Sequence, residues 1–180
     1  MIDPLEDICR ALIVELGDNP DRPGLVDTPA RWSRWWREFS DYDAGTLDTA
    51  FEHLYVDQMV IVSGIRVFSL CEHHLLPFWC DISIGYIPKG CVLGLSKFAR
   101  VAHAHAHRLQ VQERLVNDIA RDIMALAKSH DVAVVGRGEH LCMTMRGIKT
   151  PAQMTTSAMF GEFRASQSTR AEFLSLAGLS

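Results

Sequence analysis

The chain has 180 residues, of which 48% are hydrophobic and 22% are charged, and its formal net charge is −4. This length fits one domain with a sizeable core. The acidic balance argues against a protein that binds nucleic acid through an overall basic surface, so an anionic small substrate would need a local cluster of cations. No apolar run reaches the length of a membrane span, the first residues do not resemble a signal sequence, and the five cysteines form no disulfide pattern. These features predict a cytoplasmic protein with no membrane or nucleic-acid partner.

Two helices are expected in the first forty residues. The apolar stripe from Asp3 to Leu16 has a helical period. Thr28-Pro29 is typical of an N-cap followed by proline at the first helical position, and the helix from Ala30 to Phe39 should carry three tryptophans on its apolar face. Arg31 and Arg34 lie three apart on a different face, where spacing alone favours a solvated surface.

Two strands are expected in the middle of the chain, from Met59 to Leu70 and from Phe78 to Ile87, because both segments are rich in Val and Ile. The segment from Cys71 to Pro77 separates them, which predicts an antiparallel pair joined by this segment. A short helix is expected before them, around Leu47 to Leu54.

The second half predicts two helices, from Ser96 as N-cap to about Arg108 and from Gln110 to Lys128. Val132 to Met145 is expected to form one strand or two pieces of one, with a bulge or bend at Gly136-Arg137-Gly138. A last strand from Thr155 to Phe163 and a terminal helix beginning at Ser166 follow. Strand pairs separated by helix pairs predict an α+β domain with an antiparallel four-stranded sheet.

The segment Cys71-Glu72-His73-His74 carries a thiol and two imidazoles, which are the usual ligands of zinc. Cys71 and His74 are three apart, so one tight turn could direct both at a single ion and leave His73 for proton transfer. The best distant partner is Cys142, and three protein ligands would leave the fourth position for water, as in catalytic zinc sites. The alternative is that the cysteines are buried apolar residues and the histidines lie on the surface. The clustering in a polar break between two strands favours the metal.

A second histidine-rich run contains His103, His105 and His107. Histidines four apart can bind a metal on one helical face, but this run contains no third ligand. A surface or subunit-contact role is therefore favoured.

A zinc-bound water ionises near a pKa of about 7, which suits hydrolytic attack on an electron-poor carbon. His73 and His140 are candidate proton donors or acceptors near such a site. Glu113 could accept two N–H donors from a guanine-like edge, or could simply complement the N-terminal dipole of its helix. A polyanion such as a triphosphate could be held by the cations Lys97, Arg100, Arg146 and Lys149.

Six stretches of the chain closely resemble the GTP cyclohydrolase I family and occur in the order found in that family. The similarity extends from about Asp21 to Phe173. The matching stretches are Arg22–Arg31, Cys71–Pro77, Gly85–Lys89, Gly94–Arg100, Arg108–Leu115 and His140–Gly147.

The resemblance implies a role for each matching residue. The zinc ligands of the family, one ion per subunit, match Cys71, His74 and Cys142. Its catalytic histidines match His73 and His140, and a residue of the later steps matches Ser96. Its guanine-recognition pair matches Gln112 and Glu113. Its positions near the triphosphate match Arg31, Arg34, Lys97, Arg100 and Arg146.

The resemblance also implies a tunnelling fold in a single domain over residues 1–180, with N-terminal helices in 1–40 and the core in 56–180. It implies a homodecamer of two pentameric rings with active sites between subunits. The implied reaction opens the guanine ring of GTP, releases formate and rearranges the product to 7,8-dihydroneopterin triphosphate. Three alternatives remain open: a family member that stops after ring opening, one that acts on another purine, and a non-catalytic, zinc-stabilised oligomer or regulatory subunit.

Overall fold

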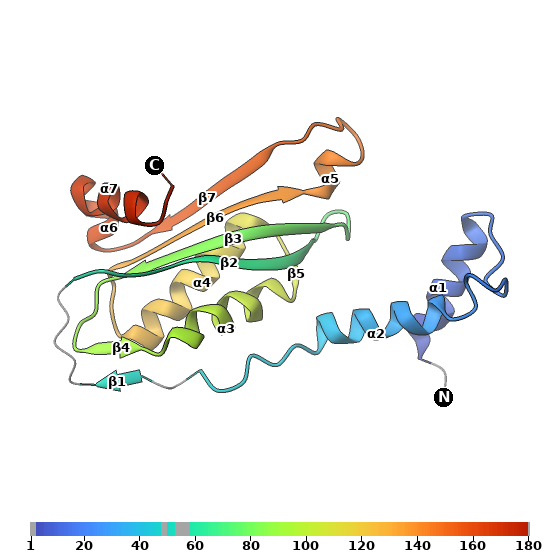
Figure 1. Cartoon of the computed structure of the whole chain (residues 1–180), viewed down its shortest axis with the longest axis horizontal. Helices are drawn as coiled ribbons and strands as arrows, with labels where there is room; N and C mark the ends of the chain where they lie inside the picture. Colours follow the sequence, from blue (N-terminus) through green and yellow to red (C-terminus); the bar gives the residue numbers. More distant parts are fainter. Residues whose placement is uncertain (1–2, 48–49, 53–57, 180) are drawn as a thin grey trace. The chain divides into compact units, whose positions relative to one another are not determined.

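The structure is a computed structural model that describes residues 3–47, 50–52 and 58–179 (Figure 1). The chain divides into two compact units, Met1–Tyr42 and Asp43–Ser180. In the described parts of the chain, no helix combines the length and apolar composition needed to cross a bilayer.

The first unit consists of helices α1 (Pro4–Glu15) and α2 (Thr28–Ser40). Both helices are predicted from the sequence, but Asp27 rather than Thr28 is the N-cap of α2. Asp3 caps α1 by accepting a hydrogen bond of 3.0 Å from the Leu5 N–H. The same carboxylate receives two hydrogen bonds from the Arg37 guanidinium near the end of α2, at 2.9 and 3.0 Å. These bonds hold the pKa of Asp3 well below its usual range and tie the two helices together.

The second unit is built on a five-stranded sheet with the order β5-β2-β3-β6-β7. All neighbours are antiparallel except β2 and β5, which are parallel over Leu70–Cys71 and Leu109–Gln110. The predicted α+β architecture is confirmed, but the sheet has five strands rather than four, because two residues between the helices pair with the end of β2. The strands are β2 (Val60–Cys71), β3 (Pro77–Tyr86), β5 (Leu109–Gln110), β6 (Val132–His140) and β7 (Gln153–Met159).

The antiparallel β2–β3 pair across the Cys71–Pro77 segment is confirmed by the register, which pairs Leu70 with Pro77 and Val60 with Tyr86. The irregularity of the sheet lies in β2, where the register shifts between Val62 and Ile65. Gly64 adopts a φ of 74° at this point, a conformation that favours glycine.

The expected bulge at Gly136-Arg137-Gly138 is wrong. β6 runs through these residues in unbroken register with both β3 and β7. The glycines are needed for space, since a Cβ on Gly138 would lie 2.0 Å from the Trp79 carbonyl oxygen. The strand expected from Leu141 is also wrong, because Leu141–Thr144 forms the short helix α5.

Helices α3 (Leu95–Ala106) and α4 (Gln112–Ala127) cover one face of this sheet (Figure 1). They pack against alternate residues of β6, Val132 and Val134, in the main core. Gly94 rather than Ser96 is the N-cap of α3. Lys128, which has a left-handed φ of 50°, is the C-cap that follows α4.

The C-terminal helices α6 (Glu162–Ala165) and α7 (Gln167–Leu176) form a second, smaller core with the other face of β6. Phe163 and Phe173 pack edge to face, with 5.5 Å between ring centroids, against Ala133 and Val135. The predicted start of the terminal helix is confirmed by the Ser166 Oγ, which accepts a hydrogen bond from the Thr169 N–H at 3.2 Å.

A two-stranded antiparallel sheet joins β1 (Ala50–Glu52) to β4 (Cys91–Leu93). The helix expected around Leu47 to Leu54 is therefore wrong for Ala50–Glu52, where pairing with β4 decides the conformation. Residues 48–49 and 53–54 of that prediction lie outside the described residues.

Candidate metal centre and active site

The turn between β2 and β3 places Cys71 beside His74. The Cys71 N–H donates to the Leu76 carbonyl at 2.9 Å, and its carbonyl accepts from the Leu75 N–H at 2.8 Å and the His74 N–H at 3.2 Å. Leu75 adopts a φ of 54°, which closes the turn. The Cys71 Sγ and the His74 Nδ1 lie 3.6 Å apart as a result.

The register of the sheet brings Cys142 to the same turn. His140, the last residue of β6, pairs with Phe78 at the start of β3, directly after the turn. The single turn of α5 then places Cys142 two residues further on. The ligand atoms of Cys71, His74 and Cys142 all lie within 4.8 Å of one another, and they are the group of three potential metal ligands found among the described residues.

These three residues fit a tetrahedral zinc ion. Bonds of about 2.3 Å to sulfur and about 2.0–2.1 Å to nitrogen at a tetrahedral angle put the two ligand atoms about 3.6 Å apart. The Sγ–Nδ1 distance of 3.6 Å matches this separation. Two thiols and one imidazole form a donor set that zinc prefers. With three protein ligands, a fourth position remains for water.

The pKa of the Cys142 thiol is raised above its ordinary value. Burial raises the pKa of its thiol, and the hydrogen bond with Cys71 raises this pKa further. Arg146, in the loop after α5, lies close enough to act in the opposite direction. A cation held between the two sulfurs would favour their thiolate forms.

His140 is held from two sides at the edge of this group. Its ring stacks on Phe78, with 4.5 Å between centroids and an interplanar angle of 6°. Its Nε2 lies 2.9 Å from the Oε1 of Gln112, the first residue of α4. Burial lowers the pKa of His140, and Glu113 opposes this effect. The lowered pKa favours the neutral imidazole, which is the form that can accept a proton.

His73 occupies the exposed side of the turn, with 64% of its side chain accessible. Its Nε2 lies 3.8 Å from the Glu72 Oε1, and the Glu72 carboxylate is also paired with Arg114. His73 thus lies beside the three candidate ligands without being part of the group.

A pocket of about 190 Å³ joins these residues. It is smaller than the roughly 300–1,000 Å³ of typical ligand pockets. A larger hollow of about 650 Å³ on the opposite face of the sheet, beside Arg66, Asp81 and Arg137, contains none of the candidate ligands. The small pocket is lined by Cys71, His73, His74, Gln110, Val111, Gln112, Glu113, His140, Cys142 and Met154.

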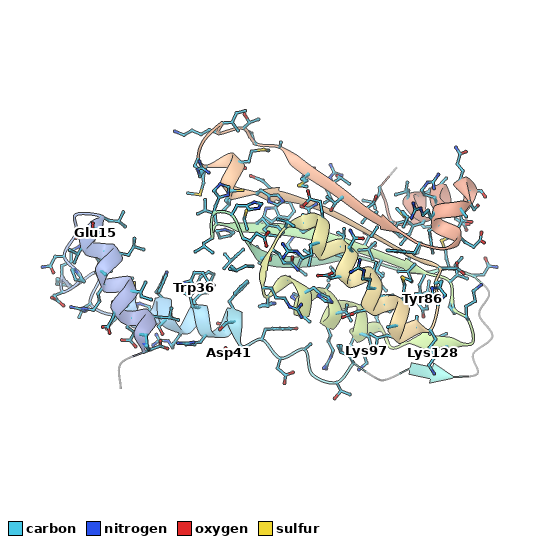
Figure 2. All side chains as sticks on the ribbon, turned by 180° about the vertical axis from the view of Figure 1, so that it is seen from behind. Glu15, Trp36, Asp41, Tyr86, Lys97 and Lys128 are labelled. Carbon is cyan, nitrogen blue, oxygen red and sulfur yellow. The ribbon has the colours of Figure 1, made fainter. Side chains whose placement is uncertain are left out.

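Three predicted site residues lie far from this pocket within the chain. Phe98, next to Lys97, packs on Tyr86 with 5.7 Å between ring centroids. Tyr86 ends β3, whose ten residues extend about 30 Å from the metal turn. Figure 2 likewise shows Lys97 and Tyr86 at one end of the unit, with Lys128. The three residues at this remote end are Ser96, Lys97 and Arg100.

The remote cations bind the backbone of the segment before β1. Lys97 is buried and donates to the Thr46 carbonyl, and the Arg100 Nη1 donates to the Ala44 carbonyl at 2.9 Å. Arg31 and Arg34 belong to the first unit, where both are exposed and Arg31 pairs with Asp27 at 3.4 Å.

Of the surface or subunit-contact role expected for the helix histidines, the surface part is wrong for His105. This residue is buried and lies 2.7 Å from Asp122 of α4, because its face of α3 packs on that helix. The Nδ1 of His107 bonds the His103 carbonyl at 2.8 Å. Sequence reasoning also missed the contacts of Phe78 and Gln112 with His140, which no local pattern indicates.

Comparison with known proteins identifies the relatives of this chain. A model of the family described as GTP cyclohydrolase I matches residues 5–178. The chain belongs to the GTP cyclohydrolase I family. A GTP cyclohydrolase 1 from Methylococcus capsulatus is 46% identical over 179 residues, covering 97% of this chain and 97% of that protein. The Saccharomyces cerevisiae GTP cyclohydrolase 1 is 45% identical over 175 residues, covering 94% of this chain and 72% of that protein.

A third relative, a GTP cyclohydrolase 1 from Thermobifida fusca, is 44% identical and covers 96% of this chain and 86% of that protein. The family resemblance inferred from the six sequence stretches is therefore confirmed. All six stretches lie within the matched residues 5–178.

Proposed function

We propose that this chain is a zinc-dependent GTP cyclohydrolase that converts GTP and water to formate and 7,8-dihydroneopterin triphosphate. The observation that carries the proposal is the convergence of Cys71, His74 and Cys142 within 4.8 Å, beside His73 and His140, in a member of this family. A purely structural zinc site would be closed by a fourth protein ligand, and the described residues supply three.

Cys71, His74 and Cys142 would hold one zinc ion per subunit. When bound, zinc lowers the pKa of a coordinated water to about 7 and so supplies the nucleophile for hydrolysis at neutral pH. The turn of β2–β3 and the end of β6 position the three candidate ligands.

His140 and His73 would move the protons of the reaction. His140 is held by Phe78 and Gln112 and lines the pocket, so it can exchange a proton with a nitrogen of the guanine ring. His73 is exposed at the rim, where it can exchange protons with solvent. Each is within the lining of one pocket, as general acid–base catalysis requires.

Substrate recognition would begin with Glu113, whose exposed carboxylate lines the pocket and has no hydrogen bond among the described residues. A carboxylate can accept both N–H groups on one edge of guanine. Gln112 is the second member of the recognition pair implied by the sequence resemblance. Arg146 lies near Cys142 and would contact the triphosphate.

The rest of the site would come from other copies of the chain. Ser96, Lys97 and Arg100 lie at the far end of β3 from the metal ligands, and the pocket of about 190 Å³ is too small for a nucleoside triphosphate. Both facts support the homodecamer with active sites between subunits that the resemblance implies. Arg31 and Arg34 would also contribute to the triphosphate site in this cytoplasmic assembly.

The test is to incubate zinc-loaded protein with GTP and to follow formate and the pterin chromophore together. The proposal predicts that both products appear in equal amounts. Formate without pterin would identify an enzyme that stops after ring opening. The absence of both products from a zinc-loaded oligomer would refute the proposed activity and favour another purine or a non-catalytic role.

A further inference from the structure

Gln112 is fully buried and uses both ends of its amide within the protein. Its Nε2 lies 3.0 Å from the Gly136 carbonyl oxygen, 3.1 Å from the Met154 carbonyl oxygen and 3.1 Å from the Thr156 Oγ1. Its Oε1 lies 2.9 Å from the Nε2 of His140. The first residue of α4 thus bridges β6, β7 and a candidate catalytic histidine.

These partners determine which way the amide points. The two ends of a glutamine amide are usually assigned from their hydrogen bonds, because oxygen and nitrogen look alike. Two of the three groups at one end are carbonyl oxygens, which can only accept hydrogen bonds. The NH₂ group must therefore face Gly136 and Met154, and the oxygen must face His140.

The orientation of the amide then fixes the proton on His140. The Gln112 Oε1 can only accept, so the hydrogen bond requires a proton on the His140 Nε2. In a neutral imidazole the other nitrogen, Nδ1, then carries a lone pair. Phe78 fixes the plane of the ring by stacking on it. Nδ1 has no hydrogen-bond partner among the described residues.

We propose that Gln112 is a positioning residue that holds His140 as its Nε2–H tautomer and makes Nδ1 the atom that exchanges a proton with the substrate. This inference rests on the proposed cyclohydrolase activity and specifies how its proton-transfer group is prepared. It also gives different roles to Gln112 and Glu113, the two residues of the recognition pair. Gln112 has two N–H donors and three acceptors around them, so no donor remains for a guanine, and Glu113 recognises the base alone.

Steady-state kinetics and GTP binding distinguish the two roles for Gln112. Gln112→Met keeps the length of the side chain and removes its polar atoms. A positioning role predicts that kcat falls about 100-fold or more, as expected when general acid–base catalysis is lost, while zinc content stays the same and the Kd for GTP changes by less than about threefold. A Kd raised about tenfold or more with kcat preserved would show direct guanine recognition and overturn the proposal.

Gln153→Met is the matched control. Gln153 accepts a hydrogen bond of 2.7 Å from the Arg137 Nε on the face of the sheet away from the pocket. The same substitution there should leave kcat, Kd and zinc content unchanged. A loss in this control equal to that of Gln112→Met would attribute the effect to the sheet and count against the proposal.

The tautomer can be read in the unmodified protein, which keeps the test valid if Gln112→Met does not fold. Solid-state ¹⁵N spectra of zinc-loaded protein with ¹⁵N-labelled histidine, at about pH 8 where imidazole is neutral, report which ring nitrogen carries the proton. The His140 signals are those missing from His140→Gln. Protonated Nε2 with bare Nδ1 is expected, and a proton on Nδ1 would overturn the proposal. Failure of the wild-type protein to turn over GTP would instead refute the proposed function, and the spectra remain a separate result.

Discussion

The chain contains two histidine-rich segments that look similar in sequence but have different surroundings in the fold. The turn histidines, His73 and His74, follow Cys71 in a hairpin turn, and His74 lies beside Cys142, which α5 carries directly after β6. The helix histidines, His103, His105 and His107, lie on α3 and its C-cap, where His105 bonds Asp122 of α4 and His107 bonds the His103 carbonyl.

The difference shows that histidine spacing alone does not make a metal site. Two ligands three or four residues apart are supplied equally well by a turn or a helix. A third ligand must come from elsewhere in the fold, and it must carry a compatible donor atom. Cys142 meets both conditions for Cys71 and His74, whereas Asp122 of α4 is already hydrogen-bonded to His105.

The largest expected effect is from Cys142→Ser, which removes the candidate ligand that completes the group with Cys71 and His74. Zinc affinity should fall by more than about 100-fold, since changes even to groups behind a ligand cost about 10–100-fold, and activity should disappear with the metal. Zinc content by atomic emission and GTP turnover on the same samples measure both. The matched double variant His103→Ala/His107→Ala should keep its zinc, and a zinc-replete, active Cys142→Ser would remove Cys142 from the ligand set.

The next largest effect distinguishes the roles of the two turn histidines. His73→Ala should retain zinc and bind GTP but lose turnover by at least about 100-fold, because it removes a proton-transfer group and no ligand. His74→Ala should instead lose the metal. Parallel measurements of zinc content, GTP binding and formate release check this pair. Full turnover by His73→Ala would exclude it from acid–base catalysis.

A moderate effect is expected from Glu113→Ala at the rim of the pocket. Loss of a charged hydrogen-bonding group should weaken GTP binding by about 1.5–3 kcal/mol and leave inorganic triphosphate binding unchanged. Calorimetric titration with both ligands measures the difference. Equal weakening of both ligands would contradict guanine recognition, and Gln153→Met serves again as a control away from the pocket.

The smallest effect concerns the helix histidines and the pH dependence of stability. Burial lowers the pKa of His103 below its usual value of about 6.5, and His107 lowers it further. The folded state therefore binds this proton less readily than the unfolded state does. The contribution of neutral His103 to the stability of the folded state is fully present above about pH 6.5. This contribution is lost as the pH falls towards the folded-state pKa of His103.

Denaturant unfolding of wild type and His103→Gln between about pH 5 and 8 tests this sign. As the pH falls, the free energy of unfolding of the wild type should decrease more than that of His103→Gln. Comparing the two proteins cancels the titration of the metal ligands, which both share. A difference that grows in favour of wild type as pH falls would mean that His103 is stabilised in its charged form.

Much of the local structure could be predicted from the sequence because its causes lie within a few residues. Asp3 and Ser166 each accept the hydrogen bond of a helix N-cap. The β2–β3 pair and its metal turn follow from two apolar strands around a short polar segment. The proximity of Cys71 and His74 follows from this turn, and Cys142 was a candidate third ligand because of the donor chemistry of its side chain.

Where the sequence predictions failed, packing partners distant in the chain had overridden local signals. Gly136 and Gly138 resemble a bend, yet they lie in a regular strand because β6 pairs with β3 and β7 in unbroken register. Glycine is needed at both positions because the neighbouring atoms leave no room for a Cβ. The two residues of β5 become a strand only because the end of β2 lies beside them. His105 resembles a surface residue until α4 is packed against α3.

The sequence by itself determined the donor atoms, the helices and strands that carry them, and the family to which the chain belongs. Only the tertiary structure decided which of these atoms meet. Gln112 and His140 are 28 residues apart in the chain, and their hydrogen bond depends on the register of β6 and the position of α4 on the sheet. Such contacts require several elements to pack at once, so no local pattern of residues can encode them.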